Sequence, residues 1–259
     1  MIDAAPIGLT FRRVLWLVAL LGLAPLVTVH AEPLRLTSGT KAPYFLPDRQ
    51  GFLDRLIPEV FRRIGIEAEA VQYDASARAN INANNGIDDG VAMRVRGLDK
   101  DFPNLIRIDE KVIDNEFVAF TLRHDFATTD FETLRPYEVA YIAGWKVFDD
   151  HILPGTPVTK TPNAEQLFGL LAGGRADVVL FERWQGQYLL RQGRLPARML
   201  HPPLVSTEMF LYLHKKHAAL VEPAARALRA MKSDGSYRNL VAQTLMSEST
   251  VVAPAAVPR

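Results

Sequence analysis

NAEQLFGLLAGGRADVVLFE, residues 163–182, carries the clearest helix and strand signals of this chain. Asn163 followed three residues later by Gln166 is typical of a capping box at the start of a helix. The leucine-rich run after Gln166 supplies one buried helical face, and Gly173-Gly174 predicts the end of that helix. The apolar run from Ala176 to Phe181 is short enough to be a buried strand. The stretch therefore predicts a helix that leads directly into the core of a sheet.

The front of the chain shows the same alternation of strands and helices. Residues 34–37 alternate apolar and polar side chains, which predicts a strand, and the proline-containing residues 41–51 predict a loop. Apolar positions recur at helical spacing from 56 to 64, where Gly65 is placed to end the helix, and residues 66–73 alternate again as a second strand. Such strand, helix, strand units are typical of α/β proteins.

The remaining segments extend this pattern along the chain. Further strands are expected at 114–122, at 139–147 with an interruption at Gly144-Trp145, and at 209–213. Further helices are expected at 223–231 and 237–245. The middle of the chain thus repeats the organisation of its front. This predicts an α/β architecture built from two similar units.

The first 31 residues have the layout of a cleavable secretory signal peptide. Arg12 and Arg13 form the charged region, an apolar run follows to Val27, and Val29-His30-Ala31 places small residues where a signal peptidase reads them. The run is shorter than the ~20 apolar residues of a membrane-spanning helix. We therefore expect export to the periplasm without an anchor, in preference to an uncleaved N-terminal membrane helix.

The composition excludes several classes of function. Lys and Arg nearly balance Asp and Glu, 30 against 29, so no excess of charge attracts nucleic acid or an anionic membrane. Cysteine is absent, which excludes disulfides, thiolate metal sites and a cysteine nucleophile. The chain also lacks a G-x-S-x-G elbow, a phosphate-binding loop and an H-E-x-x-H motif. We expect no catalytic residues, no metal site, no cofactor and no nucleic-acid partner.

Five short motifs follow one another along the chain. They are Ala42-Pro43-Tyr44-Phe45, the helix Gly51–Gly65, Gly86–Gly90 as a G-x-x-D strand entry, Gly173–Asp177 as G-R-A-D, and Met231–Tyr237 as M-x-x-D-G-x-Y. Their order and spacing resemble the bacterial extracellular solute-binding proteins of family 3, which have the type II periplasmic binding fold and include the amino-acid receptors of ABC importers. The resemblance covers nearly all of the chain after residue 31.

Three further segments are similar to a divergent branch of that family. Residues 78–90 match R-x-x-x-x-A-N-x-G-x-x-D-G, residues 94–98 match R-V-x-G-L, and residues 102–108 match F/Y-P-N-L-I-R-I. The branch does not by itself name a ligand. The match makes the family resemblance more specific, but it leaves the class of ligand open.

The resemblance implies two α/β lobes joined by two crossing strands, with a ligand cleft between the lobes that closes by a hinge motion. The first lobe is expected to comprise residues 32–119 and 211–248, and the second lobe residues 120–210. Residues 249–259 are expected to form a disordered tail. The crossing segments are expected near 117–122 and 210–214.

The resemblance also implies a cation for the carboxylate of an amino acid and a carboxylate for its ammonium group. The family's T-x-x-R arginine is missing, and Arg94 is the nearest equivalent by position, with Arg96 beside it. Because successive strand residues face opposite ways, we expect one of the two in the cleft and favour Arg94 over a solvated role. Counting five residues from Asp177 reaches Glu182, which would bind the ammonium group or form a salt bridge with Arg183.

Four more residues complete the predicted ligand-binding set. Tyr44 and Phe45 lie where the family places an aromatic wall, although plain core packing explains Phe45 equally well. Trp145 follows Gly144 at a strand-to-helix turn that faces the cleft in such folds. Arg78, flanked by alanines, is a second candidate for an anionic ligand group.

The leading hypothesis is a monomeric periplasmic binding protein that captures an amino acid or related zwitterion for an inner-membrane ABC permease. Two alternatives share the same cleft. One is a periplasmic enzyme similar to a cyclohexadienyl dehydratase, with Glu182 as general acid. The other is a ligand-sensing module for a membrane receptor, and the fold alone does not separate it from the first.

Overall fold

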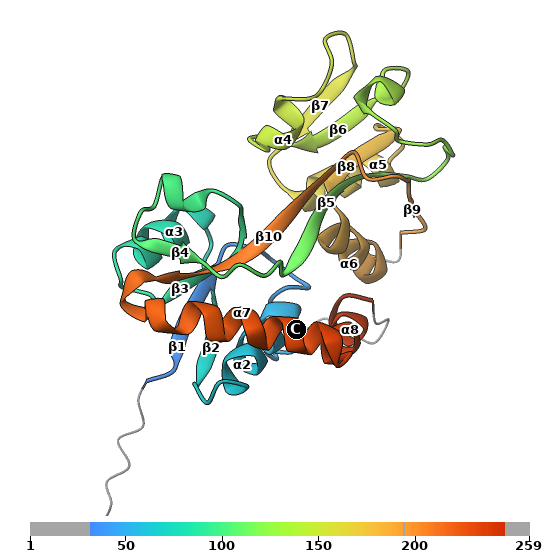
Figure 1. The fold of residues 1–259 in the computed structure, drawn as a ribbon. Coiled ribbons are helices and arrows are strands. Elements are labelled where there is room, and N and C mark those ends of the chain that lie inside the picture. The colour runs from blue at the N-terminus through green and yellow to red at the C-terminus, as the bar shows by residue number, and fades with distance from the viewer. Residues whose placement is uncertain (1–31, 194, 247–259) are drawn as a thin grey trace, which may run out of the picture. The chain divides into compact units, whose positions relative to one another are not determined.

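The computed structural model describes residues 32–193 and 195–246 (Figure 1). The signal peptide and the tail that the sequence predicts lie outside these residues. The strands are β1 (Leu34–Ser38), β2 (Ala68–Gln72), β3 (Gly90–Val95), β4 (Leu105–Arg107), β5 (Ile113–Thr121), β6 (Val139–Ile142), β7 (Val158–Thr161), β8 (Val178–Glu182), β9 (Arg198–Met199) and β10 (Val205–His214). They form a sheet in the order β2-β1-β3-β10-β5-β8-β6-β7, with β4 against β10 and β9 against β5.

The helices connect these strands and cover them. They are α2 (Phe52–Arg62), α3 (Ser76–Asn84), α4 (Lys146–Asp149), α5 (Ala164–Ala172), α6 (Arg183–Gly193), α7 (Ala218–Ser233) and α8 (Ser236–Val241), with short turns η1 (Leu98–Lys100), η2 (Phe131–Leu134), η3 (Lys215–His217) and η4 (Ala242–Met246). Within the described part of the chain, every helix is too short or too polar to cross a membrane.

The first lobe contains β1–β4, α2, α3, α7 and α8 and buries both faces of its sheet. On one face, Leu211 and Leu213 of β10 join a core with residues of α2, α7 and α8. On the other face, Phe210 and Tyr212 join a smaller core that includes Ala79 and Ala83 of α3. Strand β10 can serve both cores because successive side chains of a strand point to opposite faces.

The second lobe contains β6–β9 and α4–α6 and has the same layered construction. One core holds Leu167 of α5 and Leu190 of α6 against Phe120 of β5. The core on the other face of the sheet contains Phe148 of α4 and Leu180 of β8. Strands β6, β7 and β8 are parallel, and β5 runs antiparallel to β8.

Strands β5 and β10 join the two lobes, and Figure 1 shows them side by side. They pair antiparallel over Ile113–Phe117 and Val205–Met209, after which β5 pairs with β8, while β10 pairs with β3 and β4. The predicted two-lobed fold is thus confirmed. The paired residues that cross between the lobes come just before the predicted segments 117–122 and 210–214. Most of the residues in those two segments pair within the sheet of one lobe. The predicted lobe boundaries fall inside β5 and β10.

Three predicted elements differ at their boundaries. Helix α2 begins at Phe52, as the family motif Gly51–Gly65 implied, and not at residue 56, where the apolar helical spacing starts. The Asp54 carboxylate fixes this start because it accepts hydrogen bonds from the backbone N–H of Gly51 at 3.0 Å and of Leu46 at 2.9 Å. Helix α7 begins at Ala218, with the proline expected at its start inside the helix. The strand predicted for 139–147 is β6 followed by α4, since Gly144 turns the chain with a φ of 81°.

The predicted helix cap at Asn163 is confirmed. Its side-chain oxygen accepts a hydrogen bond from the backbone N–H of Gln166 at 2.9 Å, and α5 ends before Gly173. The helix then leads into β8, as the opening stretch of sequence predicts. This connection matters for function because β8 ends at Glu182.

Two helix glycines test how the second lobe is packed. Gly186 of α6 is buried, and a Cβ built there would lie 2.5 Å from the ring of Phe120, so Gly186→Ala is expected to destabilise the protein by ~1–3 kcal/mol. Gly169 of α5 is exposed and has open space around it, so Gly169→Ala is expected to stabilise the protein by up to ~1 kcal/mol. Urea unfolding of both variants measures the difference. A stabilising Gly186→Ala would contradict this packing.

Candidate functional site

A cavity of about 480 Å³ lies where the two lobes meet. Its lining comes from the loop after β1, from β3 and β10 of the first lobe, from the crossing strand β5, and from the turns after β6 and β8 of the second lobe. Three predicted site residues line it, Arg94, Trp145 and Glu182. A larger hollow of about 580 Å³ between α2 and α8 holds none of the predicted site residues.

Arg94 on β3 is a buried, charged cavity residue that lacks one of its hydrogen-bond partners. Its side chain is only 8% exposed. Its Nε donates to the side-chain oxygen of Asn80 at 2.6 Å and its Nη1 donates to the carbonyl of Met93 at 2.9 Å, while its buried Nη2 has no hydrogen-bond partner. Burial lowers the pKa of Arg94 to about 10, so the guanidinium stays charged at neutral pH.

A backbone irregularity positions this arginine. Met93, the residue before it, is a buried non-glycine residue with a φ of 57°, in the left-handed region that L-residues avoid. The pairing of β3 with β10 shifts register at the same place, between Phe210 and Tyr212. Irregularities of this kind re-aim side chains at functional sites. The sequence offered no signal for it, because methionine has no preference for this conformation.

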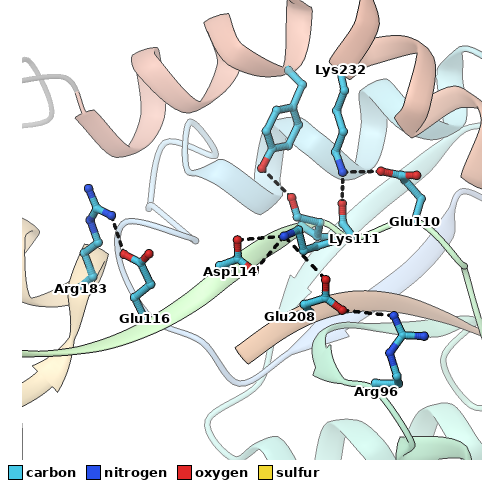
Figure 2. A network of polar contacts seen from close by, with 10 residues as sticks. Arg96, Glu110, Lys111, Asp114, Glu116, Arg183, Glu208 and Lys232 are labelled. Carbon is cyan, nitrogen blue, oxygen red and sulfur yellow. Dashed lines mark hydrogen bonds and ion pairs between the residues drawn. The ribbon is translucent and has the colours of Figure 1, made fainter. Parts of the chain in front are cut away.

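Arg96 has a different environment. Figure 2 shows its guanidinium on Glu208 of β10, at 3.2 Å, and its side chain is 55% exposed. The preference for Arg94 over Arg96 agrees with this placement, but the alternation of strand side chains does not explain it. Positions two apart share a face in a regular strand. The two arginines diverge because β3 ends at Val95, so Arg96 lies beyond the strand.

Glu182 lies at the end of β8, where α6 begins, and is 1% exposed. Its carboxylate accepts hydrogen bonds from the backbone N–H of Trp184 at 3.1 Å and of Gln185 at 2.8 Å. A third comes from the hydroxyl of Tyr44, in the first lobe, at 3.0 Å. Burial raises the pKa of Glu182, while these three donors oppose the shift. The carboxylate therefore caps α6 and ties the lobes together.

Tyr44 and Phe45 are placed differently from the predicted aromatic wall. Both are buried, at 0% and 7% exposure, and neither is among the residues that line the cavity. The ring of Tyr44 packs edge-on against Phe52 in the first-lobe core. The contribution of Tyr44 to the site is thus its hydroxyl, which reaches Glu182, and the core-packing alternative describes Phe45.

The aromatic lining of the cavity comes from the second lobe and the crossing strand. Trp145 stacks on Phe181 with ring centroids 4.8 Å apart, and Phe117 of β5 meets the Trp145 ring edge-on at 5.9 Å. Phe117 and Trp145 both line the cavity. The sequence identified Trp145 from its place after Gly144 but missed Phe117, because a phenylalanine in an apolar strand is indistinguishable from a core residue.

Two further expectations are corrected by the structure. Arg78 is exposed on α3 and is not among the cavity residues, and Ser76 lines the cavity from that helix instead. Arg183 does not pair with Glu182 but with Glu116 of β5, as Figure 2 shows. Its guanidinium also lies over the ring of Trp184. Helix geometry explains this, since Glu182 turns back onto the first backbone N–H groups of α6.

Several cavity residues were missed by the sequence analysis. They are Lys41, Asn115, Lys146, Gln185 and Met209, among others. Each is a common surface or strand residue type in its own segment. They are recognised as site residues only because the fold brings these separate segments together around one cavity.

The hydrogen bond between Tyr44 and Glu182 predicts a pH-dependent stability change. Tyr44→Phe is expected to cost ~1–3 kcal/mol at pH 7, because it removes a donor from a buried carboxylate. The hydroxyl lowers the pKa of Glu182, so its loss raises that pKa further. The variant therefore loses relatively more stability as the pH rises through this pKa, and the deficit shrinks toward pH 4.

Urea unfolding at pH 4 and pH 7 measures this difference. Tyr137→Phe is the matched control, because that half-buried ring stacks on Phe126 and its hydroxyl has no hydrogen bond among the described residues. A deficit that is equal at both pH values, or absent at pH 7, would contradict the assignment.

The comparisons with known proteins come from sequence and structure. No family model matches the chain. An uncharacterized protein of Shewanella oneidensis is 28% identical over 154 residues, which is 56% of this chain, so the chain spans little more than half, 57%, of that relative.

Solved structures match the fold over most of its length. A mutant of ArgBP from T. maritima matches with a TM-score of 0.60 and 21% identity, over 83% of this chain and 95% of that one. The GluR0 ligand-binding core from Nostoc punctiforme, in complex with L-glutamate, matches with a TM-score of 0.62 and 18% identity, over 83% and 100%. The substrate-binding protein of an amino acid ABC transporter matches with a TM-score of 0.60 and 15% identity, over 83% and 99%. The chain therefore has the two-lobed fold of the type II periplasmic binding proteins, as its resemblance to family 3 solute-binding proteins implied.

Proposed function

We propose that this protein is a solute-binding protein of family 3 that captures a small polar ligand in the cavity between its lobes. The observation that carries the proposal is Arg94, a buried guanidinium that lines the cavity and has one buried nitrogen without a hydrogen-bond partner. A buried polar group in a native protein normally has a partner. A ligand carboxylate would supply it with a charge-assisted hydrogen bond.

The other walls of the cavity fit a ligand with the chemistry of an amino acid. Glu182 presents a carboxylate that an ammonium group could approach, and Trp145 with Phe117 provides apolar area for a side chain or carbon chain. Since these groups come from both lobes and from β5, a ligand would contact all of them only when the lobes are suitably closed. Closure would therefore be favoured by the ligand itself.

The similar proteins support a role in transport. One of the solved structures is the substrate-binding protein of an amino acid ABC transporter, and another is a ligand-binding core in complex with L-glutamate. We infer that the protein works as a monomer in the periplasm and presents an amino acid or related zwitterion to an inner-membrane ABC permease. Delivery of the ligand to a membrane sensor would use the same cavity. A neighbouring permease gene would favour import, and a neighbouring kinase gene would favour sensing.

Ligand binding by Arg94 is tested by calorimetric titration of protein from which bound ligand has been stripped by unfolding and refolding. The probes are the twenty L-amino acids, polyamines and organic acids. For the ligand that binds, Arg94→Gln is expected to weaken affinity about 100-fold or more, because a buried charge pair is lost. The variant should still fold, since it removes a buried charge that has no carboxylate partner, although it also loses the hydrogen bonds of Arg94 to Asn80 and to the Met93 carbonyl.

Arg96→Gln is the matched control for that titration. Arg96 is two residues away, is half exposed and pairs with Glu208 outside the cavity, so its loss should leave affinity within about twofold. Flat titrations with correctly folded protein would argue against the binding function. Equal effects of the two substitutions would argue against the role of Arg94.

The alternative of a dehydratase-like enzyme has less support. Glu182 would be the general acid, yet both of its oxygens already accept hydrogen bonds, two of them from the start of α6. No second carboxylate is among the described residues that line the cavity. Turnover of a prephenate-like substrate that Glu182→Gln abolishes would favour the enzyme.

Export to the periplasm is tested at the N-terminus. The predicted cleavage after Ala31 gives a mature protein that begins with Glu32-Pro33-Leu34. N-terminal sequencing of protein recovered from a periplasmic extract is expected to yield these residues. Recovery of the intact N-terminus in the membrane fraction would contradict a cleaved signal.

A further inference from the structure

The cavity between the lobes is lined by more positively charged than negatively charged side chains. Three cationic side chains line it, Lys41 from the loop after β1, Arg94 from β3 and Lys146 from α4, whereas Glu182 is the one carboxylate among its described lining residues. The whole chain is nearly neutral, with 30 basic and 29 acidic side chains. The excess of positive charge is therefore a property of this cavity and not of the protein as a whole.

The protein itself does little to neutralise the three cations. Arg94 has no carboxylate partner, and Lys146 has no ion pair among the described residues. Lys41 contacts Asp74 at 3.4 Å, but the Asp74 side chain is fully exposed, and exposed pairs of this kind contribute little. Two lysines and an arginine thus remain available to an anion.

The single carboxylate is largely engaged. Glu182 accepts hydrogen bonds from Tyr44 and from two backbone N–H groups, so much of its acceptor capacity is used inside the protein. Burial also raises the pKa of Glu182 and so disfavours its charged form. Its attraction for a ligand cation is weaker than that of a free carboxylate, and it does not balance the cavity.

Resting on the solute-binding function proposed above, we propose that the natural ligand is a small molecule with two carboxylate groups, with one carboxylate at Arg94 and the second near Lys41 and Lys146. Both acidic amino acids and plain dicarboxylates have this chemistry. The apolar wall of Trp145 and Phe117 would cover the short carbon chain between the two groups. A basic or neutral ligand would leave the lysines without a counter-charge.

The first experiment compares ligands that differ only in the second charge. Ligand-stripped protein is titrated with L-glutamate against L-glutamine, L-aspartate against L-asparagine, and glutarate and succinate against their monoamides. In at least one pair, the member with two carboxylates is expected to bind at least tenfold more tightly than its amide, with affinity that falls as salt rises. Binding of glutamate or aspartate identifies an acidic amino acid, and binding of glutarate or succinate identifies a plain dicarboxylate.

The possible failures are distinguishable. If an amide, a neutral amino acid or L-arginine binds as tightly as or more tightly than every ligand with two carboxylates, the charge proposal is overturned while the solute-binding function stands. If folded, ligand-stripped protein binds no probe of any charge, both proposals are overturned.

Substitution of the lysines tests where the second carboxylate is bound. Lys41→Gln and Lys146→Gln are each expected to reduce the preference for the ligand with two carboxylates over its amide at least threefold, and the double variant to reduce it further. Both side chains are exposed at the surface of the cavity, so the variants should fold normally. Lys100→Gln, at an exposed lysine outside the cavity, is the control and should leave the preference unchanged. An unchanged preference in the double variant would overturn the proposed position of the second carboxylate.

Discussion

The buried carboxylate of Glu182 is the interaction on which the arrangement of the site depends. It receives a hydroxyl group from the first lobe and two backbone N–H groups from the first turn of α6. The neighbouring Trp184 packs into the core of the first lobe although it belongs to a helix of the second. A buried carboxylate is costly unless it is well hydrogen-bonded, so each of these donors helps to keep Glu182 buried at this position. They hold the start of α6 against the first lobe, at one wall of the cavity.

The opposite wall depends on a strained strand. Left-handed backbone at a buried methionine costs ~1–3 kcal/mol, and such strain persists only where the surrounding structure over-determines it. Here the surroundings are β10 on one side and the first-lobe core on the other. The consequence is an arginine turned inward with one nitrogen unpartnered. The backbone at Met93 and the unpartnered nitrogen of Arg94 both lower the stability of the protein. Destabilising features of this kind are expected at sites that bind a ligand.

The two walls of the cavity differ in how completely the protein satisfies the hydrogen bonds of their charged residues. Glu182 is well supplied with donors from the protein, whereas Arg94 is not supplied with acceptors. The site is therefore better prepared to receive an anion than a cation. Similar folds bind different ligands, so this difference in local hydrogen bonding, and not the fold, distinguishes the chemistry of the cavity.

The sequence by itself determined the local elements of this protein and the identity of several cavity residues. The cap at Asn163, the helix end at Gly173 and the strand that leads to Glu182 all follow from contacts within a few residues, and local pattern reports such contacts well. Arg94, Trp145 and Glu182, which line the cavity, were singled out because their positions correspond to those of site residues in the family that the chain resembles.

Only the tertiary structure decided what these residues meet. The partner of Glu182 is Tyr44, 138 residues away, and no local pattern encodes a contact at that separation. The left-handed backbone at Met93 is imposed by pairing with β10, so it overrides the preference of the residue itself. The exposed Arg78 and the missed lysines have the same explanation. A side chain's place at a surface or in a cavity is set by segments that the sequence does not place beside it.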